Sequence, residues 1–429
     1  MKVIRIKKGS EESILNELTN RTEEDLSEID VTVKKIINTV RTEGDKGLLQ
    51  LTADIEKVQL KSLKVSENEI EEAFGKIDNK FMDILNKASE NIRSFHEKQS
   101  EKSWQYEKSN GVILGQLINP LESVCVYVPG GKAAYPSSVL MNVIPAKIAG
   151  VERIAMTTPP GKDGKINPYI LAAAKVAGVD EIYKLGGAQA VAALAYGTET
   201  IKPVKKIVGP GNIYVARAKK YVFGLVDIDM IAGPSEICII ADESADASYV
   251  AADFLSQAEH DEMAASILVT TSEAFAQQSI QEVESQLAKL SRVDIAQKAI
   301  ENNGMVILTE DMDSAFKVSN IIAPEHLELM LEKPMEYVNK VKNAGAVFLG
   351  KYAPEPLGDY MAGPNHTLPT GGTAAFASPL GVYDFIKRSS LIYYTEDALR
   401  AEKDYIIEFA EKEGLTAHGN SIKVRFGEI

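Results

Sequence analysis

The sequence predicts an α/β protein with mostly parallel sheets covered by helices on both faces. From about residue 124 onward, short apolar runs such as VCVYV, RIAMTT and EICII alternate with helical segments and glycine turns. This alternation is typical of parallel sheets, because a helical crossover returns the chain to the same end of the sheet. The chain has 429 residues, and a chain of this length is expected to form more than one domain.

The first hundred or so residues are expected to be helical and charged. Apolar residues between positions 33 and 40 recur with the spacing of one helix face. Ser66 and Glu69 have the spacing of a capping box, which marks a helix start. His96 lies among charged residues near the end of another helical stretch, and we predict that it lies on the surface.

Further helices are predicted between the strands and near the C-terminus. Three segments rich in small residues separate predicted strands: Ala146–Gly150, Leu171–Gly178 and Ala188–Tyr196. A charged segment, Asp397–Glu411, is expected to be a helix followed by a small C-terminal appendage.

Composition excludes several classes of protein. The net charge of −14 argues against nucleic acid and anionic membranes as partners. No apolar run is long enough to span a bilayer, and the first residues lack the apolar core of a signal peptide. Cys125 and Cys238 both fall in strand-like runs, so no disulfide framework is expected. A cytoplasmic location follows as the expectation.

Three glycine-rich turns follow predicted strands: Gly130–Lys132, Gly186–Gln189 and Gly209–Asn212. Such turns direct backbone N–H groups toward a ligand. None has the GxxxxGK[ST] order of a nucleotide triphosphate loop or the GxGxxG order of a Rossmann turn. A dinucleotide would therefore bind without the usual turn, and the alternative is that these are plain strand–helix connections.

Gln257 and His260 lie three residues apart in Asp253–Asp261, which we expect to be a buried helix. Their side chains would leave the same helix face, where an amide oxygen and an imidazole can hold a metal. Most such pairs are ordinary hydrogen-bonding residues, so the pair is a weak signal by itself. The chain has only five histidines, however, and His418 also lies in a polar, glycine-containing segment.

Glu325 and His326 follow Pro324 and are expected at a helix start. A carboxylate beside an imidazole supplies two groups that can act as bases near neutral pH. A glutamate at a helix start is equally expected for its interaction with the helix dipole. Ser235, in a turn before a predicted strand, offers a hydroxyl that could meet a ligand.

Residues 357–372 are predicted to form a long irregular loop, and such loops often carry function. Asp359 is a candidate metal ligand or base in this loop, and His366 is a candidate positioning residue. Gln257, His260, Asp359 and His418 together give a nitrogen–oxygen ligand set without thiolates, which is typical of catalytic rather than structural zinc.

Long blocks of the sequence resemble the histidinol dehydrogenase family. They are YVPGGKAAYPSSVLMN, GPGNIYVARAKK, AGPSEI, SQAEHD, APEHLEL and GDYMAGPNHTLPTGG. The likeness runs from about Tyr127 to Phe376 and recurs at His418. It implies a zinc- and NAD-dependent four-electron oxidation of L-histidinol to L-histidine, through bound L-histidinaldehyde, in the final steps of histidine biosynthesis.

The resemblance also implies roles for individual residues. The implied zinc ligands are Gln257, His260, Asp359 and His418, and the acid–base pair is Glu325 and His326. Substrate contacts would come from Ser235, Glu413, His326 and the four ligands. The NAD contacts would be Tyr127, Gln189 and Asn212. No role is implied for His366.

For the fold, the resemblance implies two incomplete Rossmann-like domains, related to aldehyde dehydrogenases, with small N- and C-terminal extensions. The expected divisions are an N-terminal extension over 1–21, a main α/β domain over 22–127 and 235–380, a second Rossmann-like domain over 128–234, and a tail over 381–429. The family forms homodimers in which the tail reaches the partner's site.

Three alternatives stay open at this point. An aldehyde step could pass through a cysteine thiohemiacetal, although Cys125 and Cys238 lie in apolar runs where a buried, inert thiol is expected. A zinc hydrolase could use the same ligands with Glu325 activating water and without a dinucleotide. A catalytically silent zinc-stabilised scaffold would bind metal but neither NAD nor histidinol.

Overall fold

A computed structural model describes residues 1–15, 26–130 and 134–428. It divides the chain into two units, one of residues 1–99 and 121–385 and another of residues 100–120 and 386–429. The domain boundaries expected from the sequence stay a prediction, and the first of them includes residues 16–21, which lie outside the described residues. Within the described ranges, no helix is both long enough and apolar enough to cross a bilayer.

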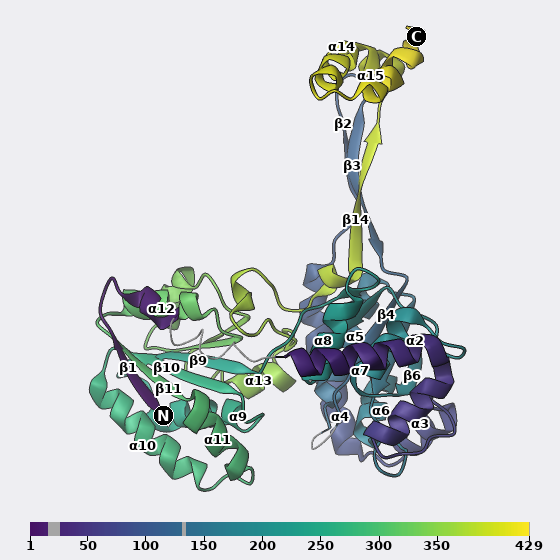
Figure 1. The fold of residues 1–429 in the computed structure, drawn as a ribbon. Coiled ribbons are helices and arrows are strands. Elements are labelled where there is room, and N and C mark those ends of the chain that lie inside the picture. The colour runs from purple at the N-terminus through teal and green to yellow at the C-terminus, as the bar shows by residue number, and fades with distance from the viewer. Residues whose placement is uncertain (16–25, 131–133, 429) are drawn as a thin grey trace. The chain divides into compact units, whose positions relative to one another are not determined.

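The first unit contains two parallel sheets, which confirms the predicted fold class (Figure 1). In one sheet, five strands of the described chain run in the order β6-β5-β4-β7-β8, and every neighbouring pair is parallel. Their bounds are β4 Ser123–Tyr127, β5 Arg153–Thr158, β6 Glu181–Lys184, β7 Lys206–Val208 and β8 Asp227–Ile228. Numbered along the chain, this order is 3-2-1-4-5, which matches five of the six strands of a doubly wound dinucleotide-binding sheet.

Helices cover both faces of this sheet because successive strand side chains point to opposite sides. Val124 and Val126 pack in one core with residues of α5 (Pro136–Ala149) and α6 (Pro168–Ala177). Cys125 and Tyr127 pack in the other core with α7 (Gly187–Tyr196) and α8 (Ile213–Val222). The three small-residue segments predicted as helices all lie within or at the ends of these helices.

In the other sheet, six described strands run in the order β1-β11-β10-β9-β12-β13, again all parallel. Their bounds are β1 Lys2–Ile6, β9 Glu236–Ala241, β10 Ala265–Thr270, β11 Met305–Thr309, β12 His326–Met330 and β13 Ala346–Leu349. One face packs against α9 (Ala247–Ala258), α10 (Glu273–Leu287) and α11 (Val293–Asn303). The other face packs against α12 (Met312–Ile322). A short helix, α13 (Glu355–Tyr360), lies beside β12, where the Glu355 N–H donates a hydrogen bond to the Glu328 carboxylate.

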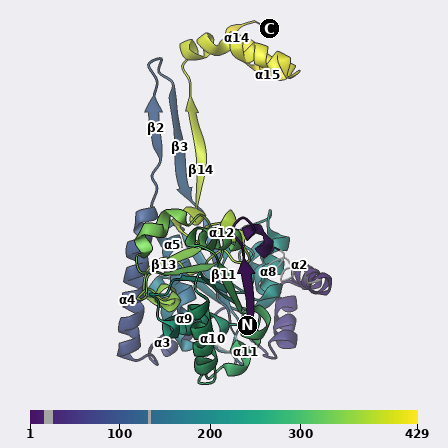
Figure 2. The same ribbon diagram turned by 90° about the vertical axis from the view of Figure 1, so that its left-hand side faces the viewer.

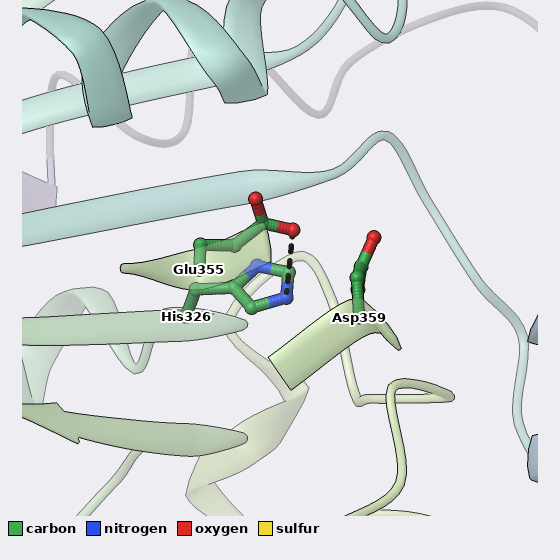
Figure 3. Close-up of side chains that lie close together, drawn as sticks. All are labelled: His326, Glu355 and Asp359. Atoms are coloured by element: carbon green, nitrogen blue, oxygen red, sulfur yellow. Dashed lines mark ion pairs between the residues drawn. The ribbon is translucent and has the colours of Figure 1, made fainter. Parts of the chain in front are cut away.

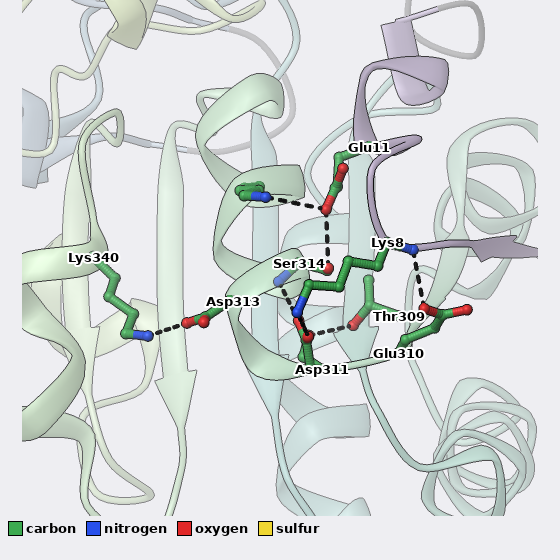
Figure 4. Close-up of polar contacts among 9 residues, drawn as sticks. Lys8, Glu11, Thr309, Glu310, Asp311, Asp313, Ser314 and Lys340 are labelled. Atoms are coloured by element: carbon green, nitrogen blue, oxygen red, sulfur yellow. Dashed lines mark hydrogen bonds and ion pairs between the residues drawn. The ribbon is translucent and has the colours of Figure 1, made fainter.

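The prediction that the first hundred residues are helical is partly wrong. Residues Lys2–Ile6 form β1, which pairs with β11 as an edge strand. The loop after β1 is fixed to the start of α12, where the Lys8 ammonium contacts Asp311 at 2.8 Å and Glu11 accepts a hydrogen bond from Ser314 at 2.9 Å (Figure 4). These partners lie some 300 positions away in the chain, so no local pattern announces them.

The helices that follow agree with the sequence pattern. They are α2 (Ser27–Ile55), α3 (Glu67–Phe74) and α4 (Asn79–His96). The apolar residues between positions 33 and 40 are buried in α2, and the predicted capping box at Ser66 is present. The prediction that His96 lies on the surface is wrong, because its side chain is fully buried and its Nδ1 lies 2.8 Å from the Ile92 carbonyl oxygen. The 3-10 segments described in this unit are η1 Glu11–Ser13, η2 Glu97–Gln99, η3 Pro334–Lys340, η4 Thr373–Ala375 and η5 Val382–Phe385.

The second unit pairs chain segments from two distant parts of the sequence (Figure 2). Its antiparallel strands run in the order β14-β3-β2, with bounds β2 Trp104–Glu107, β3 Ile113–Pro120 and β14 Ile386–Tyr393. Beyond β14 come α14 (Glu396–Lys412), α15 (Thr416–Lys423) and η6 (Val424–Phe426). The charged helix predicted over Asp397–Glu411 is thereby confirmed as α14.

Gly209, between β7 and α8, has a backbone that only glycine adopts readily. Its φ is +108°, and a Cβ there would clash with the carbonyl oxygen of Tyr127. Gly224 has a similar φ of +100°, but no atom of the described residues lies within 4 Å of the corresponding position. A positive φ of this kind costs a larger residue about 1–3 kcal/mol.

We therefore expect Gly209→Ala to lower the melting temperature more than the matched control Gly224→Ala. Both variants carry the backbone strain, but only Gly209→Ala also forces the end of β4 to move. Differential scanning calorimetry of both variants and the parent measures the difference. Equal losses would show that the close approach to Tyr127 contributes nothing beyond strain.

Candidate functional site

Glu325 and His326, the carboxylate–imidazole pair, lie at the start of a strand, so the prediction that they lie at a helix start is wrong. Ala323 adopts φ +47° and ends α12, and His326 is the first residue of β12. Glu325 accepts a hydrogen bond from the Glu236 N–H at 2.8 Å, while His326 Nδ1 lies 3.0 Å from the Glu236 carbonyl oxygen. The main chain of β9 thus holds both side chains, whose nearest N and O atoms are 3.7 Å apart.

Burial shifts the pKa of both groups. Removal from water raises the pKa of Glu325 well above its usual value and lowers the pKa of His326 to about 4. His326 is therefore neutral near pH 7. Because a carbonyl oxygen can only accept, Nδ1 carries the ring proton, and Nε2 is left as a free acceptor. The pair thus presents an imidazole nitrogen that can take a proton.

Two carboxylates from α13 lie next to His326 (Figure 3). His326, Glu355 and Asp359 each offer a ligand atom, and these atoms lie within 4.8 Å of one another. His326 Nε2 and Glu355 Oε1 are 3.9 Å apart. Burial, with the Asp359 charge, raises the pKa of Glu355 to about 8. Sequence reasoning missed Glu355, although its spacing of four residues from Asp359 places both on one helix face.

The loop prediction for residues 357–372 is thus wrong at its start and right for the rest. Asp359 belongs to α13, and regular structure is absent from 361–372 within the described chain. His366, in the irregular part, has Nδ1 3.4 Å from Asp359 and Nε2 3.2 Å from the Ser138 hydroxyl. Burial alone would raise the pKa of Asp359, but His366 and the other nearby imidazoles lower it. Asp359 is therefore held as an anion.

Gln257 and His260 meet although they do not share a helix. The helix α9 ends at Ala258, so His260 lies in the turn beyond it. Gln257 Nε2 and His260 Nδ1 are still 3.3 Å apart. Gln257 Oε1 is buried and has no hydrogen-bond partner among the described residues. A buried acceptor without a donor is costly, and a cation at this position would satisfy it.

His260, Asp359 and His366 line one cavity of about 350 Å³. With Gln257, they offer nitrogen and oxygen donors and no thiol, so three of the four predicted ligands are brought to one region. Ser235 is half-buried in the turn just before β9, next to the residue that holds the acid–base pair. The donor set fits a catalytic zinc ion.

His418 and Glu413 belong to the second unit, and each is exposed there. Glu413 follows the last turn of α14, and His418 lies in α15. Their predicted roles as ligand and substrate contact stay predictions.

The three predicted NAD contacts line a second cavity of about 1190 Å³. Tyr127 ends β4, and its hydroxyl accepts a hydrogen bond from the Gly187 N–H at 3.0 Å. Gln189 is fully buried in α7, and neither of its amide atoms has a partner in the described part of the chain. Asn212 caps α8 by accepting from the backbone of Tyr214 at 3.1 Å. Gly131 and Lys132, in the first glycine turn, lie outside the described residues.

This cavity lies at the carboxyl ends of the strands in the five-stranded sheet. The strand order changes direction between β4 and β7, and Tyr127 and Asn212 follow these two strands. Ligands in open α/β sheets bind at such a switch point. The unpartnered amide of Gln189 is a group that a polar ligand would satisfy.

The two cysteines are buried inside the sheets as free thiols. Burial raises the pKa of both Cys125 and Cys238 to about 12. Neither lines the cavities that hold the candidate site residues. These thiols are poorly placed to serve as nucleophiles.

The fold and the site together define an α/β enzyme in which a buried carboxylate–imidazole pair stands beside a candidate metal centre. A family model described as histidinol dehydrogenase matches residues 19–426. The chain belongs to the histidinol dehydrogenase family, and it is an oxidoreductase.

Comparisons with individual proteins support the same family membership. The chain is 55% identical to histidinol dehydrogenase of Clostridium acetobutylicum, over 97% of this chain and 96% of the relative. It is 56% identical to that of Listeria monocytogenes serotype 4b, over 99% of this chain and 100% of the relative. The crystal structure of histidinol dehydrogenase from Elizabethkingia anophelis is similar with a TM-score of 0.92 and 38% identity, covering 100% of this chain and 98% of that one.

The state of the two thiols gives a direct test of the packing around them. Only a thiolate is alkylated rapidly, and a thiol with a pKa of about 12 is not ionised near neutral pH. We expect iodoacetamide at about pH 8 to leave Cys125 and Cys238 unmodified in the native protein and to alkylate both in guanidinium. Mass spectrometry counts the adducts.

The same shift links the thiols to stability at high pH. Because folding raises the pKa of each thiol, the folded state is favoured most below the unfolded pKa of about 8.5, and this contribution to stability is lost as the pH rises toward 12.

In the alkylation experiment, modification of either cysteine in the native protein would contradict the burial described above.

Proposed function

We propose that the protein oxidises L-histidinol to L-histidine in two steps, with L-histidinaldehyde kept bound between them and NAD as the acceptor of both hydrides. This is the final chemistry of histidine biosynthesis. The observation that carries the proposal is the buried pair Glu325 and His326, with a free Nε2, beside the donors Gln257, His260 and Asp359. A cytoplasmic location stays the expectation from the sequence.

We propose that Gln257, His260 and Asp359 hold a zinc ion together with His418. The unpartnered Gln257 Oε1 and the anionic Asp359 support this assignment. When bound, zinc would hold the amine and imidazole nitrogens of the substrate and so fix its carbinol carbon. Fixing the reacting groups in this way lowers barriers by up to about 7–11 kcal/mol in ideal cases.

A homodimer would supply the last site residues. In this proposal His418 of the partner subunit completes the zinc site, and Glu413 of the partner subunit joins Ser235 as a substrate contact. The second unit has large apolar side chains that are exposed in the single chain, including Trp104, Ile392 and Phe409. Such side chains are typical of surfaces that another protein covers, which supports the proposed dimer.

NAD would occupy the cavity at the switch point of the five-stranded sheet. Tyr127, Gln189 and Asn212 line it from three different elements. Among them, Gln189 has both amide atoms free to pair with polar groups of the cofactor. The bound cofactor would accept a hydride at its nicotinamide ring.

The first oxidation needs a base for the hydroxyl proton. His326 Nε2 is unprotonated and would take this proton, while NAD, when bound, would accept the carbinol hydride, so that the alcohol would become the aldehyde with one NADH formed. His326 Nδ1 stays on the Glu236 carbonyl oxygen, which fixes the ring. A positioned base of this kind contributes roughly 10²–10⁴-fold to the rate.

The second oxidation needs a hydrated aldehyde. We assign to Glu325, acting through His326, the proton transfer that turns water into the attacking nucleophile. Burial makes the ionised Glu325 a stronger base than a free carboxylate, because it raises the pKa of the group. The hydrate would then give its hydride to a second NAD and release its protons to the base and solvent, which leaves a carboxylate. No cysteine adduct is needed.

The proposal is tested by counting NADH formed per L-histidinol consumed, on zinc-loaded and chelator-stripped protein. We expect two NADH per histidine, lost on stripping and restored by zinc. One NADH with free aldehyde would contradict the second step. Turnover of another substrate without NAD would contradict the proposal as a whole.

The roles of the acid–base pair are tested separately by His326→Asn and Glu325→Gln. We expect each to lower kcat by at least about 10²-fold, the low end of what a general base supplies, while zinc content stays at one ion per subunit. Double replacement of Cys125 and Cys238 by alanine is the control and should leave the NADH yield unchanged. A variant that loses zinc but keeps its rate would overturn the assignment.

A further inference from the structure

A pair of buried carboxyl groups lies behind the candidate metal centre and has no part in the proposed chemistry. Asp253 on α9 is 8% exposed and Glu328 on β12 is 1% exposed. Burial raises the pKa of both carboxyl groups, that of Asp253 to about 6, and the two groups also interact with each other. No cationic side chain within the described ranges forms an ion pair with either. Burying two carboxyl groups without a cationic partner is costly.

Glu328 also caps the helix that carries Asp359. Glu328 Oε1 accepts a hydrogen bond from the Glu355 N–H at 2.8 Å, and Glu355 is the first residue of α13. The first N–H groups of a helix have no partner within it. The preceding residue, Pro354, provides no side-chain cap, so a strand residue supplies the acceptor instead.

The helix α13 depends on this contact because it is short. It covers only Glu355–Tyr360, and helices of this length do not persist without tertiary contacts. A shift of its first turn would move Asp359, which lies one turn further along. Asp253 stands one turn before Gln257 on α9, so the Asp253–Glu328 contact joins the segments that carry two proposed ligands.

We infer that Glu328, supported by Asp253, is a positioning residue that sets the placement of Asp359 and thereby the affinity of the metal site. This inference rests on the proposed zinc site and concerns residues outside it. Groups that orient metal ligands change metal affinity by about 10–100-fold when they are removed. The effect reaches the metal through α13, since Glu328 is not itself a proposed ligand.

The test measures Zn²⁺ affinity of the full-length, metal-stripped protein by competition with a chromogenic chelator. We expect Glu328→Ala to bind Zn²⁺ about 10–100-fold more weakly than the parent. Glu328→Gln should bind close to the parent, because its amide oxygen still accepts from Glu355 and its NH₂ group can donate to Asp253. Glu328→Asp, which keeps an acid but shortens its reach, should be weakened even if Glu328→Ala fails to fold.

The matched control is Glu11→Ala. Glu11 is also buried, at 6% exposed, and its carboxylate also fixes the first turn of a helix, through Ser314 of α12. Glu11→Ala should lower the melting temperature without changing Zn²⁺ affinity. If Glu328→Ala and Glu328→Asp lose stability like this control but bind Zn²⁺ as the parent does, the inference is overturned. A parent that takes up no Zn²⁺ would instead contradict the proposed metal site itself, and the inference with it.

Discussion

The candidate site depends on two contacts of the Glu236 main chain, one with Glu325 and one with His326. Its N–H holds Glu325 and its carbonyl oxygen holds His326, and the parallel pairing of β9 with β12 places it there. Because both side chains are buried, these two hydrogen bonds replace water as their polar partners. They also fix the imidazole tautomer, which leaves Nε2 free toward the α13 carboxylates. A change in the register between β9 and β12 would break both hydrogen bonds. The His326 tautomer would then no longer be fixed, and Nε2 would no longer face the α13 carboxylates.

Much of this arrangement could be predicted from the sequence. The apolar runs and small-residue helices predicted parallel α/β sheets, and the described strands at VCVYV, RIAMTT and EICII agree. Gln257 and His260 were paired from their spacing and do meet. The thiols of Cys125 and Cys238, expected to be buried and inert, are buried. Patterns of period two and 3.6 suffice for these features because they are local.

What could not be predicted depends on distant partners. His326 begins a strand because β9 and β13 pair with β12 on either side. The local sequence Pro324-Glu325-His326 is equally compatible with the start of a helix. His96 is buried because other elements cover it, although its neighbours in sequence are charged. Glu355 and Glu328 are ordinary acidic residues in the sequence, and only the contact between α13 and β12 reveals their position. The N-terminal strand owes its conformation to β11, some 300 residues away.

In the proposed site a metal is held by Gln257, His260 and Asp359, with His418 of the partner subunit, beside the acid–base pair but not by it. The most direct test is a crystal structure of the zinc-loaded protein with anomalous data collected at the zinc absorption edge. We expect one peak per site within bonding distance of Gln257 Oε1, His260 and Asp359, with His326 Nε2 unligated. A peak bound instead by His326, Glu355 and Asp359, the other group of donors that lie close together, would contradict it, because His326 could then not serve as the base.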